Sequence, residues 1–212
     1  MTARIFKAAQ MNAEDIYAVA GALSRGAVAV FPTDTVYGIG TGAFCQEAVA
    51  EIYRIKRRPQ TQPLQILTDT VAHAREVGVF SASARRLARA FWPGALTLIV
   101  PPTEKGKAFT CGAAGVGIRI PAHPLLLNIL HFLPMPLAST SANLHGQPVL
   151  TQEKTLAGIF GQKTAIIIEG GTLSPVASSV VDLTQEDHPR LLREGSIRRA
   201  ALEHMLKWPF AE

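Results

Sequence analysis

The sequence lacks the residue patterns that indicate a metal centre or a disulfide framework. Its two cysteines, Cys45 and Cys111, stand far apart without a Cys-x-x-Cys pair, and its six histidines show no paired spacing. A zinc site and a set of structural disulfides are therefore excluded as features that the sequence encodes. Each cysteine is better interpreted as a small, buried apolar side chain.

Long apolar runs are missing as well. No run reaches the ~18 residues of a membrane-spanning helix, and the opening residues 1–10 lack the apolar centre of a secretory signal. The sequence therefore predicts that the protein has no membrane segment and that it lies in the reducing cytoplasm.

Aromatic and acidic residues are scarce. Aromatic side chains form 7% of the chain, and 21 basic residues outnumber 16 acidic ones, for a formal net charge of +5. Few aromatic residues argue against a surface that stacks bases, whereas the positive charge favours an anionic partner such as a nucleotide or RNA. The 212 residues, 48% of them hydrophobic, are enough for one well-buried core.

What the sequence does contain is an alternation of helical and extended patterns. Asn12 is placed to cap a helix that ends at Gly26. Further helices are predicted at 46–57, 81–92, 123–133 and 198–207. Strands are predicted at 27–31, 63–67, 95–100, 116–120, 136–139, 165–169, 179–183 and 189–193. Both continuous and alternating apolar patterns occur, so we expect an α/β fold with a mixed, twisted sheet and helices packed on it.

Four polar clusters follow or end these elements, where sites are usually built. They are TDTVYG (33–38), KRRP with QTQPL (56–64), STSAN (139–143), and SSVVDL with LLREG (178–195). Hydroxyl, amide and cationic groups dominate them and acids are few, which predicts a concave basic cleft that binds anions.

The clusters leave the chemistry open on their own. Lys56 and Arg58 are two residues apart, so they converge only where the helix unwinds before Pro59; otherwise they are charges that face a helix dipole. The glycines of 38–42 and 112–117 match neither the Walker loop nor the dinucleotide fingerprint. Ser141 does not sit in a nucleophile elbow.

Taken in order, the motifs resemble the YrdC family, whose best-known members are threonylcarbamoyl-AMP synthases. The resemblance covers 13–197 and is carried by PTDTVYG, KRRP with PLQIL, FWPGALTLIV, VGIRIPAHP, STSAN, SSVVDL and LLREGSI. It implies the single-domain form, one YrdC-like domain over 1–212 that a helix at 198–207 closes.

The resemblance also implies a reaction and its partners. The enzyme would be a nucleotidyltransferase that joins L-threonine, bicarbonate and ATP into threonylcarbamoyl-AMP and pyrophosphate. The product would pass to the machinery that makes threonylcarbamoyladenosine in tRNA. Mg²⁺ would be carried mainly by the ATP phosphates, with Asn143 as a candidate protein ligand.

Site residues follow from the same resemblance. The K-x-R and S-x-N motifs supply the catalytic set of Lys56, Arg58, Ser141 and Asn143. The residues implied for threonine are Thr35, Tyr37, Arg58, Arg119, Ser139 and Ser179. The residues implied for ATP are Lys56, Arg58, Gln62, Ser141, Asn143, Val149 and Arg193.

Three positions depart from the common family pattern. Arg57, Gln62 and Leu67 stand where many members carry glycine, asparagine and histidine, and Leu67 cannot form a hydrogen bond. Two alternatives therefore stay open: a family member with another carbamoyl acceptor, and a module that binds double-stranded RNA or the ribosome. RNA affinity that depends on salt, without ATP turnover, would favour the module.

Overall fold

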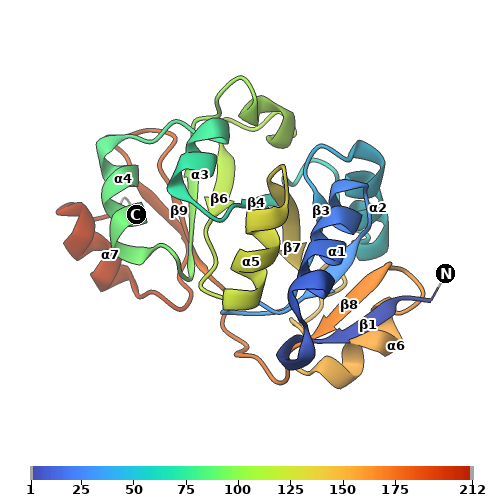
Figure 1. Ribbon diagram of the computed structural model, residues 1–212. Coiled ribbons are helices and arrows are strands. Elements are labelled where there is room, and N and C mark those ends of the chain that lie inside the picture. Colours follow the sequence, from blue (N-terminus) through green and yellow to red (C-terminus); the bar gives the residue numbers. More distant parts are fainter. Residues whose placement is uncertain (1, 211–212) are drawn as a thin grey trace.

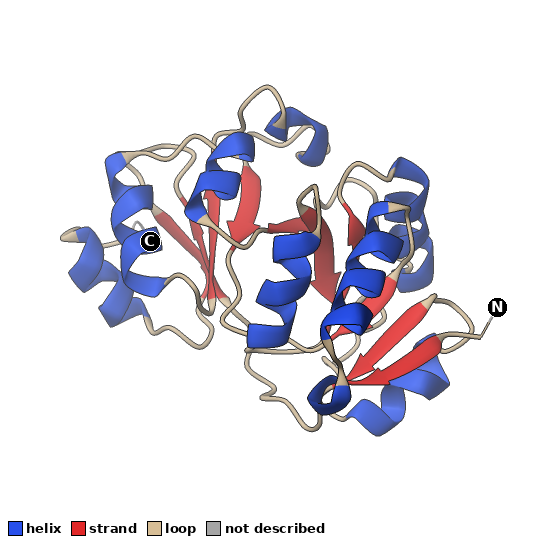
Figure 2. Cartoon of the chain, viewed as in Figure 1, coloured by secondary structure: helices blue, strands red, loops and turns tan. Residues whose placement is uncertain are grey.

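The computed structural model describes residues 2–210 and contains a central sheet with helices on both faces (Figures 1 and 2). The strands are β1 (Arg4–Lys7), β2 (Ala29–Phe31), β3 (Gly38–Gly42), β4 (Gln65–Leu67), β5 (Leu96–Val100), β6 (Val116–Arg119), β7 (Leu137–Ser141), β8 (Ile166–Glu169), β9 (Ser179–Asp182) and β10 (Arg190–Arg193). The α-helices are α1 (Ala13–Ser24), α2 (Gln46–Lys56), α3 (Val71–Val77), α4 (Ala82–Phe91), α5 (Pro124–Phe132), α6 (Leu156–Phe160) and α7 (Arg199–Leu206).

The strands of this part of the chain form one sheet of mixed direction. Its order is β1-β8-β2-β3-β7-β4-β6-β5-β9-β10. Parallel pairing joins β1 to β8, β8 to β2, β4 to β6 and β5 to β9, whereas β2–β3, β3–β7, β7–β4, β6–β5 and β9–β10 are antiparallel. The expected mixed sheet with helices packed on it is therefore confirmed.

Alternation along the strands divides the apolar residues between two cores. In β2, Ala29 and Phe31 belong to a core that also contains side chains of α1 and α5. Val30, between them, belongs to a larger core with side chains of α2, α3, α4, α6 and α7. This is the period of two that an extended strand imposes, and Figure 1 shows α1 and α5 side by side.

The first helix begins where its cap predicts. The Asn12 side chain accepts a hydrogen bond from the Asp15 backbone N–H at 2.9 Å, and the Asp15 carboxylate accepts one from the Asn12 backbone N–H at 3.3 Å. This capping box satisfies two of the N–H groups that a helix leaves unpaired at its start.

The glycine-rich segment 38–42 forms a strand that the sequence analysis did not predict. Glycine has low β-propensity, yet β3 is buried and lies between β2 and β7. A Cβ at Gly40 would lie 2.7 Å from the Ala138 carbonyl oxygen, and one at Gly38 would lie 2.7 Å from the Phe31 ring. Positions 38 and 40 therefore require glycine unless these neighbours move. The short elements β1, α3 and α6 were also missed.

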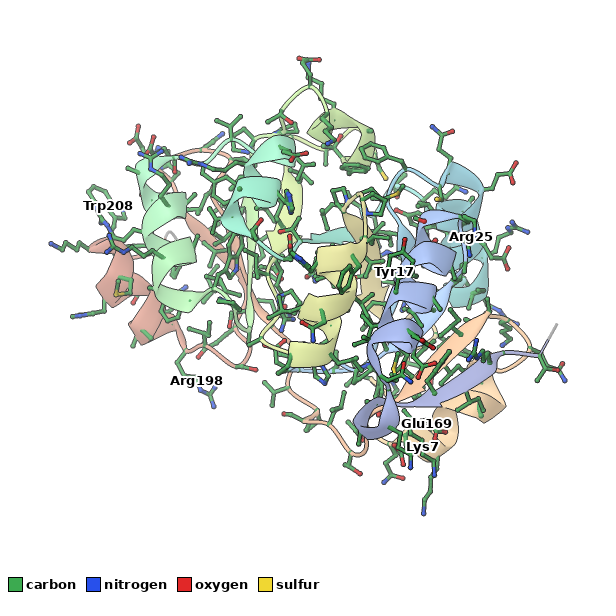
Figure 3. The ribbon with its side chains drawn as sticks, in the orientation of Figure 1. Lys7, Tyr17, Arg25, Glu169, Arg198 and Trp208 are labelled. Atoms are coloured by element: carbon green, nitrogen blue, oxygen red, sulfur yellow. The ribbon has the colours of Figure 1, made fainter. Side chains whose placement is uncertain are left out.

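Figure 3 shows labelled side chains on opposite sides of the view. At one end, Lys7 and Glu169 lie together where the register pairs β1 with β8. At the other end of the view are Arg198 and Trp208, whose side chains are exposed. Within residues 2–210, no helix combines the length and apolarity needed to span a bilayer.

Candidate active site

A cavity of about 510 Å³ is built from segments that are far apart in the sequence. Its walls come from the turn after β2, the segment after α2, six strands (β3, β4, β5, β6, β7 and β9), the segment before β9 and the end of β10. The predicted site residues that line it are Thr35, Tyr37, Arg58, Arg119, Ser139, Ser141, Val149 and Arg193.

Arg119 at the end of β6 is buried and bonded on three sides. Its Nη2 donates to Asp34 Oδ1 at 2.6 Å, its Nη1 to Thr35 Oγ1 at 3.0 Å, and its Nε to the Gly94 carbonyl at 2.9 Å. Burial lowers the pKa of Arg119 and the Asp34 carboxylate opposes that shift, so the guanidinium stays charged. Arg119 therefore holds the turn at 33–35 in place.

The hydroxyl groups of this turn are bonded to one another. Thr33 Oγ1 lies 3.0 Å from Thr35 Oγ1, accepts from the Thr35 backbone N–H at 3.0 Å and donates to the Val36 carbonyl at 2.7 Å. Tyr37 is fully buried, and its hydroxyl donates to the Gly171 carbonyl at 2.7 Å. The Tyr37 hydroxyl also accepts from the Gly170 N–H at 2.9 Å, so it is bonded to the segment at 170–171.

Lys56 is a buried cation that fixes the S-x-N motif. Its ammonium donates to the Ser141 carbonyl, to the Asn143 carbonyl at 2.6 Å and to Asn143 Oδ1 at 3.2 Å. Ser141 Oγ also donates to Asn143 Oδ1, at 2.6 Å. Burial, followed by the charge on Arg58, lowers the pKa of Lys56 to about 8. Lys56 thus lies behind the cavity and positions the two residues of the motif.

Arg58 and Arg193 bring two more guanidinium groups to the cavity. Arg58 donates to the carbonyls of Gln62 and Pro63, at 3.2 Å each. Arg193 donates to the Ser178 carbonyl at 2.9 Å and to Ser178 Oγ at 3.1 Å. Burial lowers the pKa of both guanidinium groups, and the Arg119 charge lowers that of Arg193 further. A bound anion would relieve this crowding of positive charge.

Four of the predicted residues do not line the cavity: Lys56 and Asn143, which are bonded to each other, and Gln62 and Ser179. The Ser179 side chain is buried outside the cavity wall, where its hydroxyl donates to the Ile197 carbonyl at 2.6 Å and accepts from the Gly195 N–H at 2.9 Å. It therefore supports the chain after β10, while its neighbour Ser178 lines the cavity. Gln62 is exposed and offers Arg58 its backbone carbonyl.

Four polar residues were missed in the sequence. Asp34 is the ion partner of Arg119, and Gln65, Thr97 and Ser178 are joined to Arg193 by hydrogen bonds. Gln65 and Thr97 are single polar residues within apolar strands, which do not form a motif. The available signal was the alternation of side chains along a strand, which puts each of them on the face opposite to its immediate apolar neighbours.

The end of α2 explains how Lys56 and Arg58 serve one site. Arg57 adopts a left-handed conformation with φ 53°, and the backbone N–H of Arg58 returns to the Tyr53 carbonyl at 3.0 Å. The helix therefore ends at Lys56, as the spacing of the two cations required, and Arg58 turns into the cavity wall.

This backbone conformation gives a stability prediction. A residue with a Cβ loses about 1 kcal/mol of folding stability when its backbone is left-handed, whereas glycine has no Cβ and avoids this loss. Arg57→Gly should therefore raise the melting temperature by about 2–4 °C. Arg57→Ala, which keeps a Cβ, is the matched control and should show no gain in thermal denaturation. If the glycine variant melts at or below the alanine variant, the left-handed turn is not a source of strain.

Comparison with known proteins identifies the family of this chain. The family model Sua5_yciO_yrdC, described as telomere recombination, matches residues 21–195. The chain belongs to the Sua5/YciO/YrdC family.

Relatives in the Sua5/YciO/YrdC family carry one recurrent name. Threonylcarbamoyl-AMP synthase of Bacillus subtilis strain 168 is 36% identical over 198 residues, covering 92% of this chain and 57% of the relative. The protein of the same name from Bos taurus is 32% identical over 190 residues, covering 86% of this chain and 68% of the relative.

A solved structure is similar to this chain in both fold and sequence. The crystal structure of Pyrococcus abyssi Sua5 complexed with L-threonine has a TM-score of 0.91 at 33% identity, covering 99% of this chain and 62% of that chain. This chain thus spans less than two thirds of both the Bacillus relative and the Pyrococcus structure.

Proposed function

We propose that this chain is a threonylcarbamoyl-AMP synthase, which condenses L-threonine, bicarbonate and ATP. The observation that carries the proposal is the gathering of Arg58, Arg119 and Arg193 with hydroxyl groups around one cavity of about 510 Å³. Such a site suits an anionic nucleotide next to a small polar amino acid. The names of the relatives support this reading over the RNA-binding module.

Cationic side chains would do most of the catalytic work. The threonine amine would first add to bicarbonate with loss of water. An oxygen of the resulting carbamate would then attack the α-phosphorus of ATP, and the bond from that phosphorus to the oxygen of the departing pyrophosphate would break. Arg58 and Arg193 would neutralise the charge that develops on the phosphate oxygens. Arg119 and Thr35 would hold the amino acid, while Lys56 holds Ser141 and Asn143 in place. No covalent nucleophile is required.

Mg²⁺ would accompany ATP rather than reside in the protein. Among residues 2–210 there is no group of three or more His, Cys, Asp or Glu that could hold a metal ion. Asn143 Oδ1, the candidate protein ligand, already accepts hydrogen bonds from Ser141 and from the Lys56 ammonium, so both of its lone pairs are used. Phosphate oxygens and waters would therefore supply most ligands of the cation, which would screen the phosphate charge.

The wider role follows from the product. Threonylcarbamoyl-AMP is a reactive mixed anhydride, so a transferase that acts on tRNA would consume it, and the tRNA itself is a candidate partner of the basic cleft.

We further propose that 1–212 act as one YrdC-like unit in the cytoplasm, with the core at about 13–197 and the helix at 198–207 closing it.

Pyrophosphate release from Mg-ATP tests the proposal. Purified protein should release pyrophosphate only when threonine and bicarbonate are both present, and omission of either should stop the reaction. Release with bicarbonate and a different amino acid, but not with threonine, would identify another acceptor. Absence of ATP binding in calorimetry, together with salt-dependent RNA binding, would reject the enzyme and favour the RNA module.

A further inference from the structure

The neutral side chain of Gln65 occupies a central position in the cavity wall. Gln65 and Leu67 lie on the same face of β4 because strand side chains alternate, and both line the cavity. In the sheet register, Gln65 is opposite Ser139 of β7 and Leu67 is opposite Arg119 of β6. Arg119 in turn donates to Thr35. Gln65 therefore belongs to the part of the cavity that contains the residues proposed for threonine.

A chain of hydrogen bonds reaches Gln65 from a cation. Arg193 Nη2 donates to Ser178 Oγ at 3.1 Å, Ser178 Oγ lies 3.0 Å from Thr97 Oγ1, and Thr97 Oγ1 donates to Gln65 Oε1 at 2.7 Å. Since Thr97 uses its one hydroxyl proton on Gln65, Ser178 must be the donor between the two hydroxyls. Every bond then runs in the same direction, from Arg193 to the amide.

This direction fixes which end of the amide is free. The carbonyl oxygen of Gln65 is turned toward Thr97, so the NH₂ group is the end of the chain. No group within residues 2–210 accepts a hydrogen bond from that nitrogen, and the side chain is partly exposed to the cavity. Hydrogen bonds in series polarise one another, which makes a terminal N–H a better donor. The neighbouring Leu67 offers only methyl groups.

We propose that Gln65 is a specificity-determining residue that donates a hydrogen bond from its side-chain NH₂ to an oxygen of the amino-acid substrate. The inference rests on the proposed function and names the contact that selects the acceptor. Gln65 supplies the directional donor, while Leu67 beside it is buried in the core with side chains of α1 and α5 and offers the substrate no polar group. The hydrogen-bond chain from Arg193 holds the amide in the donor orientation.

Two substitutions at Gln65 separate this role from a structural one. Gln65→Leu removes both the donor and the acceptor of Thr97. Gln65→Glu is nearly isosteric and keeps an oxygen that accepts from Thr97, but it replaces the NH₂ donor by a second oxygen. A residue that only supports Thr97 would tolerate glutamate, whereas a residue that donates to substrate would not.

Steady-state kinetics of pyrophosphate release, with threonine and ATP varied in turn, test the proposal. We expect the KM for threonine to rise by about 10- to 100-fold in Gln65→Leu, as for one hydrogen bond to a charged group, with the KM for ATP within about twofold. Gln65→Glu should be impaired at least as much. Thermal denaturation checks that both variants are folded.

The outcomes distinguish this inference from the proposed function. An unchanged threonine KM in Gln65→Leu, or wild-type behaviour of Gln65→Glu, would overturn the role of Gln65 while the synthase assignment stands. An equal rise in both KM values would assign Gln65 to the general architecture and overturn the inference. Wild-type protein without threonine-dependent release would overturn the proposed function and this inference with it.

Discussion

Replacing Arg58 by alanine is expected to lower kcat/KM for pyrophosphate release by about 100- to 1,000-fold. Arg58 lines the cavity, and burial lowers the pKa of its guanidinium because water does not solvate the charge fully. Such a group stabilises negative charge that develops at the α-phosphorus more effectively than an exposed cation does. The measurement is initial-rate kinetics with Mg-ATP, threonine and bicarbonate.

The adjacent residue provides the matched control. Arg57→Ala removes the same charge from a side chain that is exposed and lies outside the cavity lining, so its kinetics should remain close to wild type. Arg58→Lys, which keeps a charge but not the fork of donors, should fall between the two. If Arg58→Ala is folded and retains full turnover, the cationic cluster is not the phosphate site.

Replacing Lys56 by methionine is expected to lower turnover by about 100-fold, the loss that a displacement of roughly 1 Å can cause. Methionine has a similar length and keeps the packing of the Lys56 stem. It cannot donate to Ser141 and Asn143, which the ammonium now joins. Stability should fall by about 1–3 kcal/mol because buried oxygens lose their donor. Activity assays and chemical denaturation of the same preparation measure both effects.

Titration of Lys56 should affect how the activity and the stability of the wild-type protein depend on pH. Its pKa is lowered from 10.5 to about 8 in the folded protein, so activity should decline above about pH 8 as the ammonium loses its proton and its bonds to the motif weaken. Stability should move in the opposite direction. Between the two pKa values the unfolded chain still holds a proton that the folded chain has released, so the Lys56 contribution to the free energy of unfolding rises with pH.

Lys56→Met separates this residue from other groups that titrate in the same range. Its residual activity should show no decline near pH 8, and its stability should lack the Lys56 contribution to the alkaline slope. An identical alkaline decline in the variant would assign that decline to another group.

Local signals in the sequence predicted much of the fold because each has a physical cause close by. Asn12 caps α1 through its own side chain, and Pro59 with the charges before it marks the end of α2. The strand β3 was not predictable in this way. Its glycines are required by the Phe31 ring and the Ala138 carbonyl, which are brought there by β2 and β7.

The candidate site follows the same division. Motif positions identified Arg58, Arg119 and Arg193, which the structure brings to one cavity. The sequence could not show that Ser178 rather than Ser179 lines that cavity, because a shift of one residue in a strand moves a side chain to the opposite face. It also could not show that Gln65 reaches Thr97 on β5, since β6 lies between their strands in the sheet.

The sheet order sets when the site can form during synthesis. β8, at residues 166–169, lies between β1 and β2, and β9 supplies the parallel neighbour of β5. A chain that has left the ribosome only as far as β7 therefore has unpaired edges at β2 and β5, which are surfaces that invite wrong association. Arg193, at the end of β10, is synthesised after both of these strands. The cavity is thus assembled after translation of most of the chain, and folding should be slow because its pairings join distant segments.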